Sequence, residues 1–177
     1  MRKAKKTKRV KKTKLPSLVS LRRKAMKLWT DKVKDMQGRV CAICGSKDGA
    51  DNGKGGRSWT NAHHIEDRSN YALRWDVLNG IAVCPSHHEF GKDSFHRSPV
   101  WSLDWVKRNR PKVIEYILAN RETRPQMAKD YSREDMIAII ARLSMPPTAA
   151  ELEILGLDRP EHPEPATEAP DRVDGAN

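Results

Sequence analysis

Three cysteines and one histidine of this chain have the spacing of metal ligands. Cys41 and Cys44 are separated by two residues, and Cys84 and His87 repeat that spacing about forty residues later. Two intervening residues let both side chains of a turn reach one ion, and two such pairs supply the four N and S ligands of tetrahedral Zn²⁺. The sequence therefore predicts a structural zinc site at Cys41, Cys44, Cys84 and His87.

Four of the six histidines occur as adjacent pairs, His63-His64 and His87-His88. Neighbouring residues of a strand point to opposite faces, so one member of the first pair can bind a metal while the other does different work. In the second pair, one ring can complete the zinc site while the other faces a second centre. The pairs therefore predict a second site beside the zinc.

The order of these motifs resembles the HNH endonuclease family. The flanking segments, such as KLWTDKVK and SFHRSPVWSLDWV, resemble phage-type members, and the likeness covers about residues 18–120. The motif residues are Cys41-A-I-Cys44, Ala62-His63-His64-Ile65, Asn79 five positions before Cys84, and Cys84-P-S-His87-His88.

The resemblance implies a ββα-metal nuclease. His64 matches the family's general base, which activates water for attack on a phosphodiester. His63 and His88 match ligands of the catalytic divalent metal. Asn79 matches the residue that holds the loop orienting the base.

Physical chemistry agrees with these implied roles. A histidine suits the base because its pKa lies near working pH, and a metal can stabilise charge on the phosphate as a Lewis acid. An N/O site with open positions admits Mg²⁺, Mn²⁺, Ni²⁺ or Zn²⁺. His87 stands where the family commonly has Cys, so one alternative makes His87 the catalytic ligand and His88 the zinc ligand.

His96 is a candidate third ligand or phosphate contact. It follows His88 by eight residues. One straight helix would place the two roughly 12 Å apart, too far for one ion. Gly91 could break the helix and let His96 fold back; otherwise His96 is a loop residue at the next helix entry.

The surrounding pattern predicts an α+β fold, a small zinc-stabilised ββα-metal core between an N-terminal helix and C-terminal helices. Residues 18–36 have an apolar face at helical spacing and a basic opposite face that includes Lys34. Strand-like pieces cover residues 39–44, 58–65 and 81–84, with a turn signal at Asn79-Gly80 and a short helix from Pro85 to about Phe90. Later helices are expected to begin near Ser98-Pro99, Pro111, Ser132 and Thr148.

The positive charge is concentrated at the N-terminus. Residues 1–34 hold 15 Lys or Arg and one acid, whereas residues 35–177 hold 19 basic and 22 acidic residues, within a total of +11. We expect residues 1–15 to be a disordered basic arm, 16–98 the nuclease core, 99–157 a helical region and 158–177 a disordered acidic, Pro-rich tail. The arm (1–14) and the helix at 18–36 are the predicted phosphate contacts, with Arg68, Arg74 and Arg97 as local candidates or exposed and ion-paired charges.

The predicted function is a metal-dependent DNA endonuclease of phage or prophage origin, in the cytoplasm of a bacterial host cell. The alternative is a non-catalytic, zinc-stabilised nucleic-acid-binding protein, which has no need of a histidine at His64. No apolar stretch approaches the roughly 20 residues of a membrane span, so a membrane partner is not expected. Family analogy adds phage packaging or recombination proteins as candidate partners.

Overall fold

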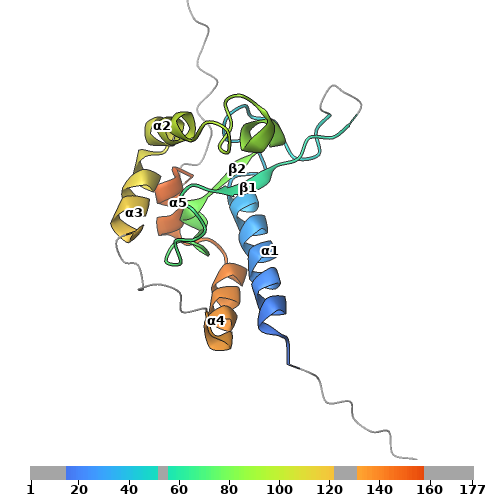
Figure 1. Ribbon diagram of the computed structural model, residues 1–177, viewed down its shortest axis with the longest axis vertical. Helices are drawn as coiled ribbons and strands as arrows, with labels where there is room; N and C mark the ends of the chain where they lie inside the picture. The colour runs from blue at the N-terminus through green and yellow to red at the C-terminus, as the bar shows by residue number, and fades with distance from the viewer. Residues whose placement is uncertain (1–14, 52–55, 122–130, 158–177) are drawn as a thin grey trace, which may run out of the picture.

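Helices surround a small antiparallel sheet in the computed structural model, which describes residues 15–51, 56–121 and 131–157 (Figure 1). The prediction of an α+β protein is confirmed. The predicted arm at 1–14 and tail at 158–177 lie outside the described residues. Within the described ranges, no helix has both the length and the apolar character to cross a membrane. The elements are α1 (Leu18–Met36), β1 (Asn61–His64), η1 (Val77–Asn79), β2 (Gly80–Val83), η2 (Ser86–Phe90), α2 (Pro99–Asn109), α3 (Pro111–Arg121), α4 (Arg133–Ser144) and α5 (Ala149–Leu155).

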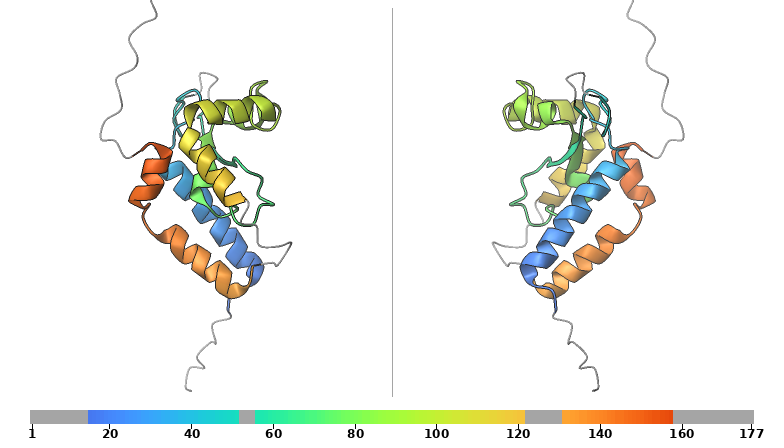
Figure 2. Two further views of the ribbon diagram at one scale, coloured as in Figure 1. Left: turned by 90° about the vertical axis from the view of Figure 1, so that its left-hand side faces the viewer. Right: turned by 90° about the vertical axis from the view of Figure 1, so that its right-hand side faces the viewer.

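Helix α1 is the central support of the fold. Ser17 caps it by accepting a hydrogen bond from the Ser20 amide (3.2 Å). Its predicted apolar face is buried, and α4 lies beside it in the views of Figures 1 and 2. The buried side chains that α1, α4, η1 and the segment before η1 bring together are Leu21, Ala25, Trp29, Val33, Trp75, Val77, Met136 and Leu143.

Strands β1 and β2 form a two-stranded antiparallel sheet in which His63 pairs with Ile81 and His64 pairs with Gly80. A turn is present at the expected Asn79, where η1 ends and the Gly80 amide donates to the Val77 carbonyl, but the inclusion of Gly80 in the turn is wrong, because Gly80 is extended (φ −116°) and starts β2. Gly80 lacks a side chain because α1 packs closely against it. A Cβ there would lie 2.4 Å from Val33 Cγ2 and 3.1 Å from Trp29 Cζ2. Glycine therefore permits α1 to pack directly onto β2.

The strand expected at 39–44 is also wrong. Val40 forms one isolated bridge with Lys47, and the residues between them turn. The Gly45 amide donates to the Cys41 carbonyl, and the Cys41 amide donates to the Ser46 carbonyl (both 2.9 Å). A turn brings Cys41 and Cys44 to the same side, which an extended strand would not do.

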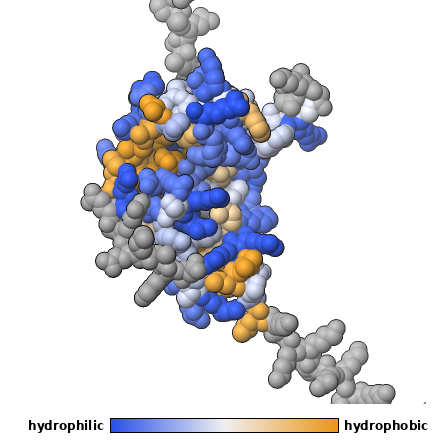
Figure 3. Space-filling view, in the orientation of Figure 1, coloured by the Kyte–Doolittle hydropathy of each residue, from blue (hydrophilic) through white to orange (hydrophobic). Residues whose placement is uncertain are grey.

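The C-terminal helices begin where the sequence predicts. Pro99 and Pro111 open α2 and α3, and capping boxes at Ser132 and Thr148 open α4 and α5. Helix α3 packs against α2, α5 and η1. Figure 3 shows apolar side chains gathered at the surface over α2 and α3, where Val100, Leu103 and Leu118 are exposed.

Candidate metal centres and cleft

The four predicted zinc ligands lie together, with one donor atom from each within 4.8 Å of the others. Cys44 Sγ is 3.8 Å from Cys84 Sγ, and His87 Nδ1 is 3.6 Å from Cys41 Sγ and 3.2 Å from Cys84 Sγ. A tetrahedral ion with Zn–S of about 2.3 Å and Zn–N of about 2.0 Å separates two sulfurs by about 3.8 Å and a sulfur from a nitrogen by about 3.5 Å. This donor set therefore fits one zinc ion, with His87 bound through Nδ1.

The protonation of these thiols links metal binding to proton release. Burial raises the pKa of Cys41 to about 11. Burial also raises the pKa of Cys44, but hydrogen bonds with Ser46, Cys41 and Cys84 together outweigh that effect and leave it below its ordinary value. Because zinc binds the thiolate, occupation of the site must displace the Cys41 proton at neutral pH.

A second cluster joins His63, His88 and His96, whose ligand atoms also lie within 4.8 Å of one another. The ring centroids are 5.2 Å apart for His63 and His88, 4.9 Å for His63 and His96, and 4.8 Å for His88 and His96. Metal–imidazole bonds of about 2.1 Å are within reach of this arrangement after small side-chain rotations. Three imidazoles would leave further positions of a divalent ion open for phosphate oxygens and water.

His96 reaches this cluster because the chain reverses after η2. The Gly91 amide donates to the Ser86 carbonyl (2.7 Å) and ends the helix, as predicted for Gly91. A Cβ on Gly91 would lie 2.7 Å from that same oxygen. The His96 amide then donates to the His88 carbonyl (3.2 Å), so the returning chain lies directly against η2. The separation of roughly 12 Å that one straight helix would impose on His88 and His96 therefore does not apply.

Burial keeps the rings of His63 and His88 neutral, which is the form that binds metals. Burial, together with the neighbouring His88, His96 and His64, lowers the pKa of His63 to about 3. Burial also lowers the pKa of His88, assisted by His96 and opposed by Glu89. His63 and His88 therefore offer free lone pairs at neutral pH.

His64 occupies the opposite face of β1, as predicted for adjacent strand residues. Its ring stacks on Trp29, and its Nε2 lies 2.9 Å from the Arg74 carbonyl oxygen. Because a carbonyl only accepts, Nε2 carries the proton and Nδ1 keeps its lone pair. Burial lowers the pKa of His64, although the bond to Arg74 opposes this shift. A neutral His64 with a free Nδ1 can act as a base.

Asn79 is fully buried and holds the loop that follows β1. Its Oδ1 accepts from the Glu66 amide (2.7 Å), and its Nδ2 donates to the carbonyls of Glu66 (2.9 Å) and Leu73 (3.2 Å). These three bonds use most of the capacity of one amide side chain. The contacts suit the loop-holding role that the motif implies for Asn79.

Side chains from both faces of β1, those of His63 and His64, line one cleft of about 520 Å³. Arg68 is exposed and lines it, whereas the Arg74 guanidinium lies 5.2 Å from the centroid of Trp75. Arg97 is exposed but does not line this cleft. The cleft is lined by Met26, Trp29, Thr30, Ala62, His63, His64, Ile65, Asp67, Arg68, His88 and His96.

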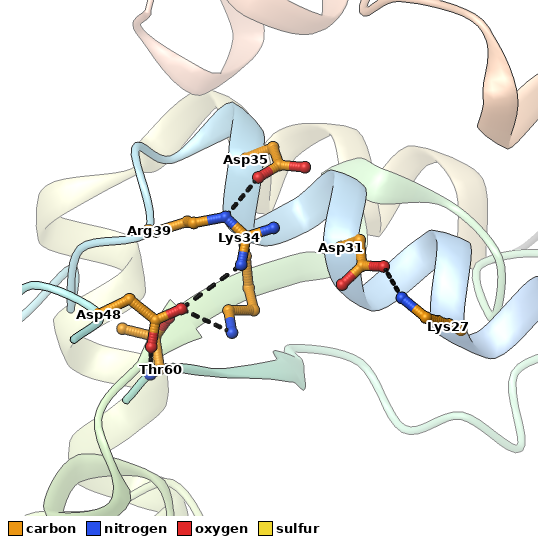
Figure 4. A network of polar contacts seen from close by, with 7 residues as sticks. All are labelled: Lys27, Asp31, Lys34, Asp35, Arg39, Asp48 and Thr60. Atoms are coloured by element: carbon orange, nitrogen blue, oxygen red, sulfur yellow. Dashed lines mark hydrogen bonds and ion pairs between the residues drawn. The ribbon is translucent and has the colours of Figure 1, made fainter. Parts of the chain in front are cut away.

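Part of the basic face of α1 is paired with acids (Figure 4). Lys27 Nζ lies 2.5 Å from Asp31, and Lys34 Nζ lies 2.9 Å from Asp48. Lys34 is 14% exposed, so this predicted phosphate contact is largely enclosed in its ion pair. Arg23 and Lys24, nearer the start of the helix, are exposed.

Sequence reasoning missed Trp29 and Asp76 as parts of the site. Trp29 was expected only as an apolar core residue, and nothing in the spacing ties it to His64. Its Nε1 donates to the Asp76 carbonyl (2.8 Å), one more contact between α1 and the loop that leads to η1. Both contacts depend on the tertiary packing of segments far apart in the chain.

Comparisons with known proteins leave these centres to be interpreted from their own geometry. Searches against protein families, curated proteins and solved structures find no match for this chain. The likeness to the HNH family therefore rests on the motif residues, and the roles that it implies are proposals.

Proposed function

We propose that this protein is a metal-dependent HNH-type endonuclease that hydrolyses DNA phosphodiester bonds. The observation that carries the proposal is the cleft in which His64 lies beside the cluster of His63, His88 and His96. A base with a free nitrogen next to a set of histidine ligands for a divalent metal is the combination that phosphodiester hydrolysis requires. In this proposal β1, β2 and η2 correspond to the ββα-metal core.

Each residue has a defined task in the proposed reaction. His64 Nδ1 takes the proton of the attacking water, while its Nε2–H bond to the Arg74 carbonyl keeps the ring in the required tautomer. His63 and His88, with His96 as third ligand, would hold a divalent ion, which would supply Lewis-acid stabilisation of the phosphate charge. Arg68 is placed to contact a phosphate at the cleft.

The structural zinc and the basic residues serve folding and binding in this proposal. Zinc at Cys41, Cys44, Cys84 and His87 ties the turn before β1 to the start of η2, which carries His88. The nine Lys and Arg of residues 1–14, with Arg23 and Lys24 on α1, are the proposed phosphate contacts outside the cleft. The phage origin and the bacterial cytoplasm remain proposals from the motif likeness.

A supercoiled-plasmid assay tests the function. The wild type, in EDTA and then with Mg²⁺, Mn²⁺, Ni²⁺ or Zn²⁺ restored, should cleave only with a divalent ion. His64→Ala should abolish cleavage while DNA binding and the circular dichroism spectrum stay unchanged. His64→Gln is the matched variant, because it keeps an N–H donor for the Arg74 carbonyl but has no basic nitrogen; it should be equally inactive.

The same assay distinguishes the proposed nuclease from the alternative function. A complete zinc site and a basic N-terminus would suffice for a non-catalytic nucleic-acid-binding protein. DNA binding without cleavage under every metal would favour that alternative. Equal cleavage by wild type and His64→Ala would reject the assigned base.

A further inference from the structure

Trp29 and His64 form a parallel ring stack that connects α1 to the proposed base. Their ring centroids are 3.8 Å apart and their planes differ by 6°. The other aromatic pairs of the described residues are tilted or edge-on, by 50° or more. Trp29 is 1% exposed, so His64 rests on a rigid, buried surface.

The two rings are anchored to the same short segment. Trp29 Nε1 donates to the Asp76 carbonyl (2.8 Å), and His64 Nε2 bonds to the Arg74 carbonyl (2.9 Å). The acceptors are two residues apart in the chain. Each hydrogen bond fixes the rotation of one ring within its plane, and the stack fixes the tilt of both.

The segment that carries these acceptors is itself held from two sides. Asp76 Oδ1 accepts from the Leu78 amide (2.9 Å), and Asp76 Oδ2 accepts from the Tyr116 hydroxyl of α3 (2.6 Å). Asp76 therefore links α1, η1 and α3 through three hydrogen bonds. Residues outside the metal clusters thus determine where the His64 ring can lie.

Packing leaves α1 little freedom to move away from the stack. His64 pairs with Gly80 in the sheet, and a Cβ on Gly80 would contact Val33 and Trp29 of α1 at 2.4 Å and 3.1 Å. The helix is thus in close contact with the strand residue opposite His64. A shift of α1 would carry Trp29 away from the imidazole.

We propose that Trp29 is a positioning residue that holds the His64 ring in the orientation needed for proton transfer. The proposal rests on the proposed nuclease function, since it assigns the support of that function's base. A misplacement of a reacting group by about 1 Å can cost roughly 100-fold in rate. Loss of the stack should therefore reduce turnover more than DNA binding.

The test compares two variants of Trp29 with one core variant that does not touch His64. Trp29→Leu removes the stack, Trp29→Phe keeps an aromatic face, and Leu21→Ala removes packing from the same apolar cluster two turns away. We expect Trp29→Leu to lower kcat by roughly 10- to 100-fold with KM for DNA unchanged. Trp29→Phe should recover most of that loss, and Leu21→Ala should lower Tm with kcat within about twofold of wild type, since each variant is assayed well below its Tm.

A second readout is independent of activity. The Trp29 ring current should shift the His64 ring protons upfield in the NMR spectrum of the wild type, assigned by comparison with His64→Ala. Those resonances should move in Trp29→Leu and stay in place in Leu21→Ala. Equal kcat values for Trp29→Leu and Leu21→Ala, or unshifted His64 resonances in Trp29→Leu, would overturn the positioning role. Cleavage by His64→Ala at the wild-type rate would instead reject His64 as the base, and the proton shifts would still report the stack. If Trp29→Leu does not fold, Trp29→Phe provides the test. Its kcat should then lie between the wild-type value and the value expected for Trp29→Leu, and its His64 resonances should lie between their wild-type positions and those expected without the stack. Values outside these ranges would overturn the positioning role.

Discussion

His87 and His88 are consecutive residues of one π-helical turn, yet their rings belong to different clusters. His87 Nδ1 lies among the sulfurs of Cys41 and Cys84, whereas the His88 ring lies against His63 and His96. Short π-helical turns are rare and frequently occur at functional sites. One peptide bond therefore connects the zinc cluster to the proposed catalytic cluster.

The two clusters should lose metal independently. Cys84→Ser should remove the tightly bound zinc and lower Tm strongly, because the turn at 41–46 loses its link to η2. His88→Ala should keep one zinc per chain but lose cleavage by roughly 100-fold or more, because loss of a mere outer-shell partner of a metal ligand already costs about 10- to 100-fold. Metal analysis after gel filtration, with the plasmid assay, measures both. Loss of zinc from His88→Ala and not from His87→Ala would support the alternative in which the two histidines exchange roles.

Gly80→Ala should destabilise the protein by about 1–3 kcal/mol, because the added methyl overlaps Val33 and presses on Trp29. Urea unfolding measures the loss, and cleavage should fall with it. Val33→Ala in the same chain supplies the control, since it removes the atoms that the new methyl meets. The double variant should be more stable than the sum of the two single effects predicts; strict additivity would contradict the close contact.

Asp48 should make stability depend on pH. Burial raises its pKa, but contacts with Lys34, the Thr60 amide and Arg39 outweigh burial and place the pKa below its ordinary value (Figure 4). A depressed pKa contributes stability that is full above the unfolded pKa of about 3.9 and is lost as pH falls through the folded pKa. Asp48→Asn should therefore cost about 1 kcal/mol at pH 7.

Asparagine still offers an acceptor to the Thr60 amide, so this variant isolates the charge. The difference in free energy of unfolding between wild type and Asp48→Asn should narrow below about pH 4. Urea titrations at pH 7, 5 and 3 measure it. A difference that stays constant across this range would show that the charge contributes nothing.

Tyr116→Phe should weaken the support of the loop at residues 74–76. The change removes the hydroxyl that donates to Asp76 and should cost about 1–2 kcal/mol, since the acceptor is charged. Burial and the neighbouring Asp76 raise the pKa of Tyr116, so the hydroxyl stays protonated as a donor. Tyr131→Phe is the matched control, because the Tyr131 hydroxyl donates to the Tyr71 carbonyl instead. At an equal loss of stability, Tyr116→Phe should lower kcat more than Tyr131→Phe does. Identical kcat values in the two variants would contradict the link to His64.

Deletion of residues 1–14 should weaken DNA binding and flatten its dependence on salt. The segment carries nine positive charges and no acid, and each phosphate that a cation neutralises adds about 0.9 to the slope of log K against log salt. Fluorescence anisotropy with one duplex across a salt series measures the slope. Deletion of residues 158–177, which removes net negative charge, is the matched truncation. An unchanged slope after removal of residues 1–14 would show that they do not bind phosphates.

The helices could be predicted because their signals are local. The apolar spacing of α1, the prolines that open α2 and α3, and the capping residues Ser132 and Thr148 each act within one helical turn. The segment at 39–44 has the composition of a strand, but the sulfurs of Cys41 and Cys44 must meet at one point, and that requirement favours a turn. Gly80 was misread because a close approach between α1 and β2, set by tertiary packing, explains it better than a local turn.

The ligand sets of the candidate site could be predicted from the sequence, but the contacts that hold these side chains in place could not. Repeated spacing grouped Cys41, Cys44, Cys84 and His87, and strand alternation separated His63 from His64. The return of His96 to His88 depended on a reversal at Gly91 that spacing alone left open. The stack of Trp29 on His64 joins residues whose proximity only the folded chain reveals.

Met136 and Leu143 of α4 share a buried cluster with Trp29, although more than a hundred residues separate Trp29 from Met136. A ribosome extends the chain from its N-terminus at about 5–20 residues per second. Several seconds therefore pass between the synthesis of α1 and the synthesis of α4, which buries the apolar face of α1. A nascent chain that ends before residue 133 already contains every proposed ligand and the base. It lacks the helix that closes the packing around Trp29. Complete packing around Trp29 therefore requires synthesis of the chain through α4.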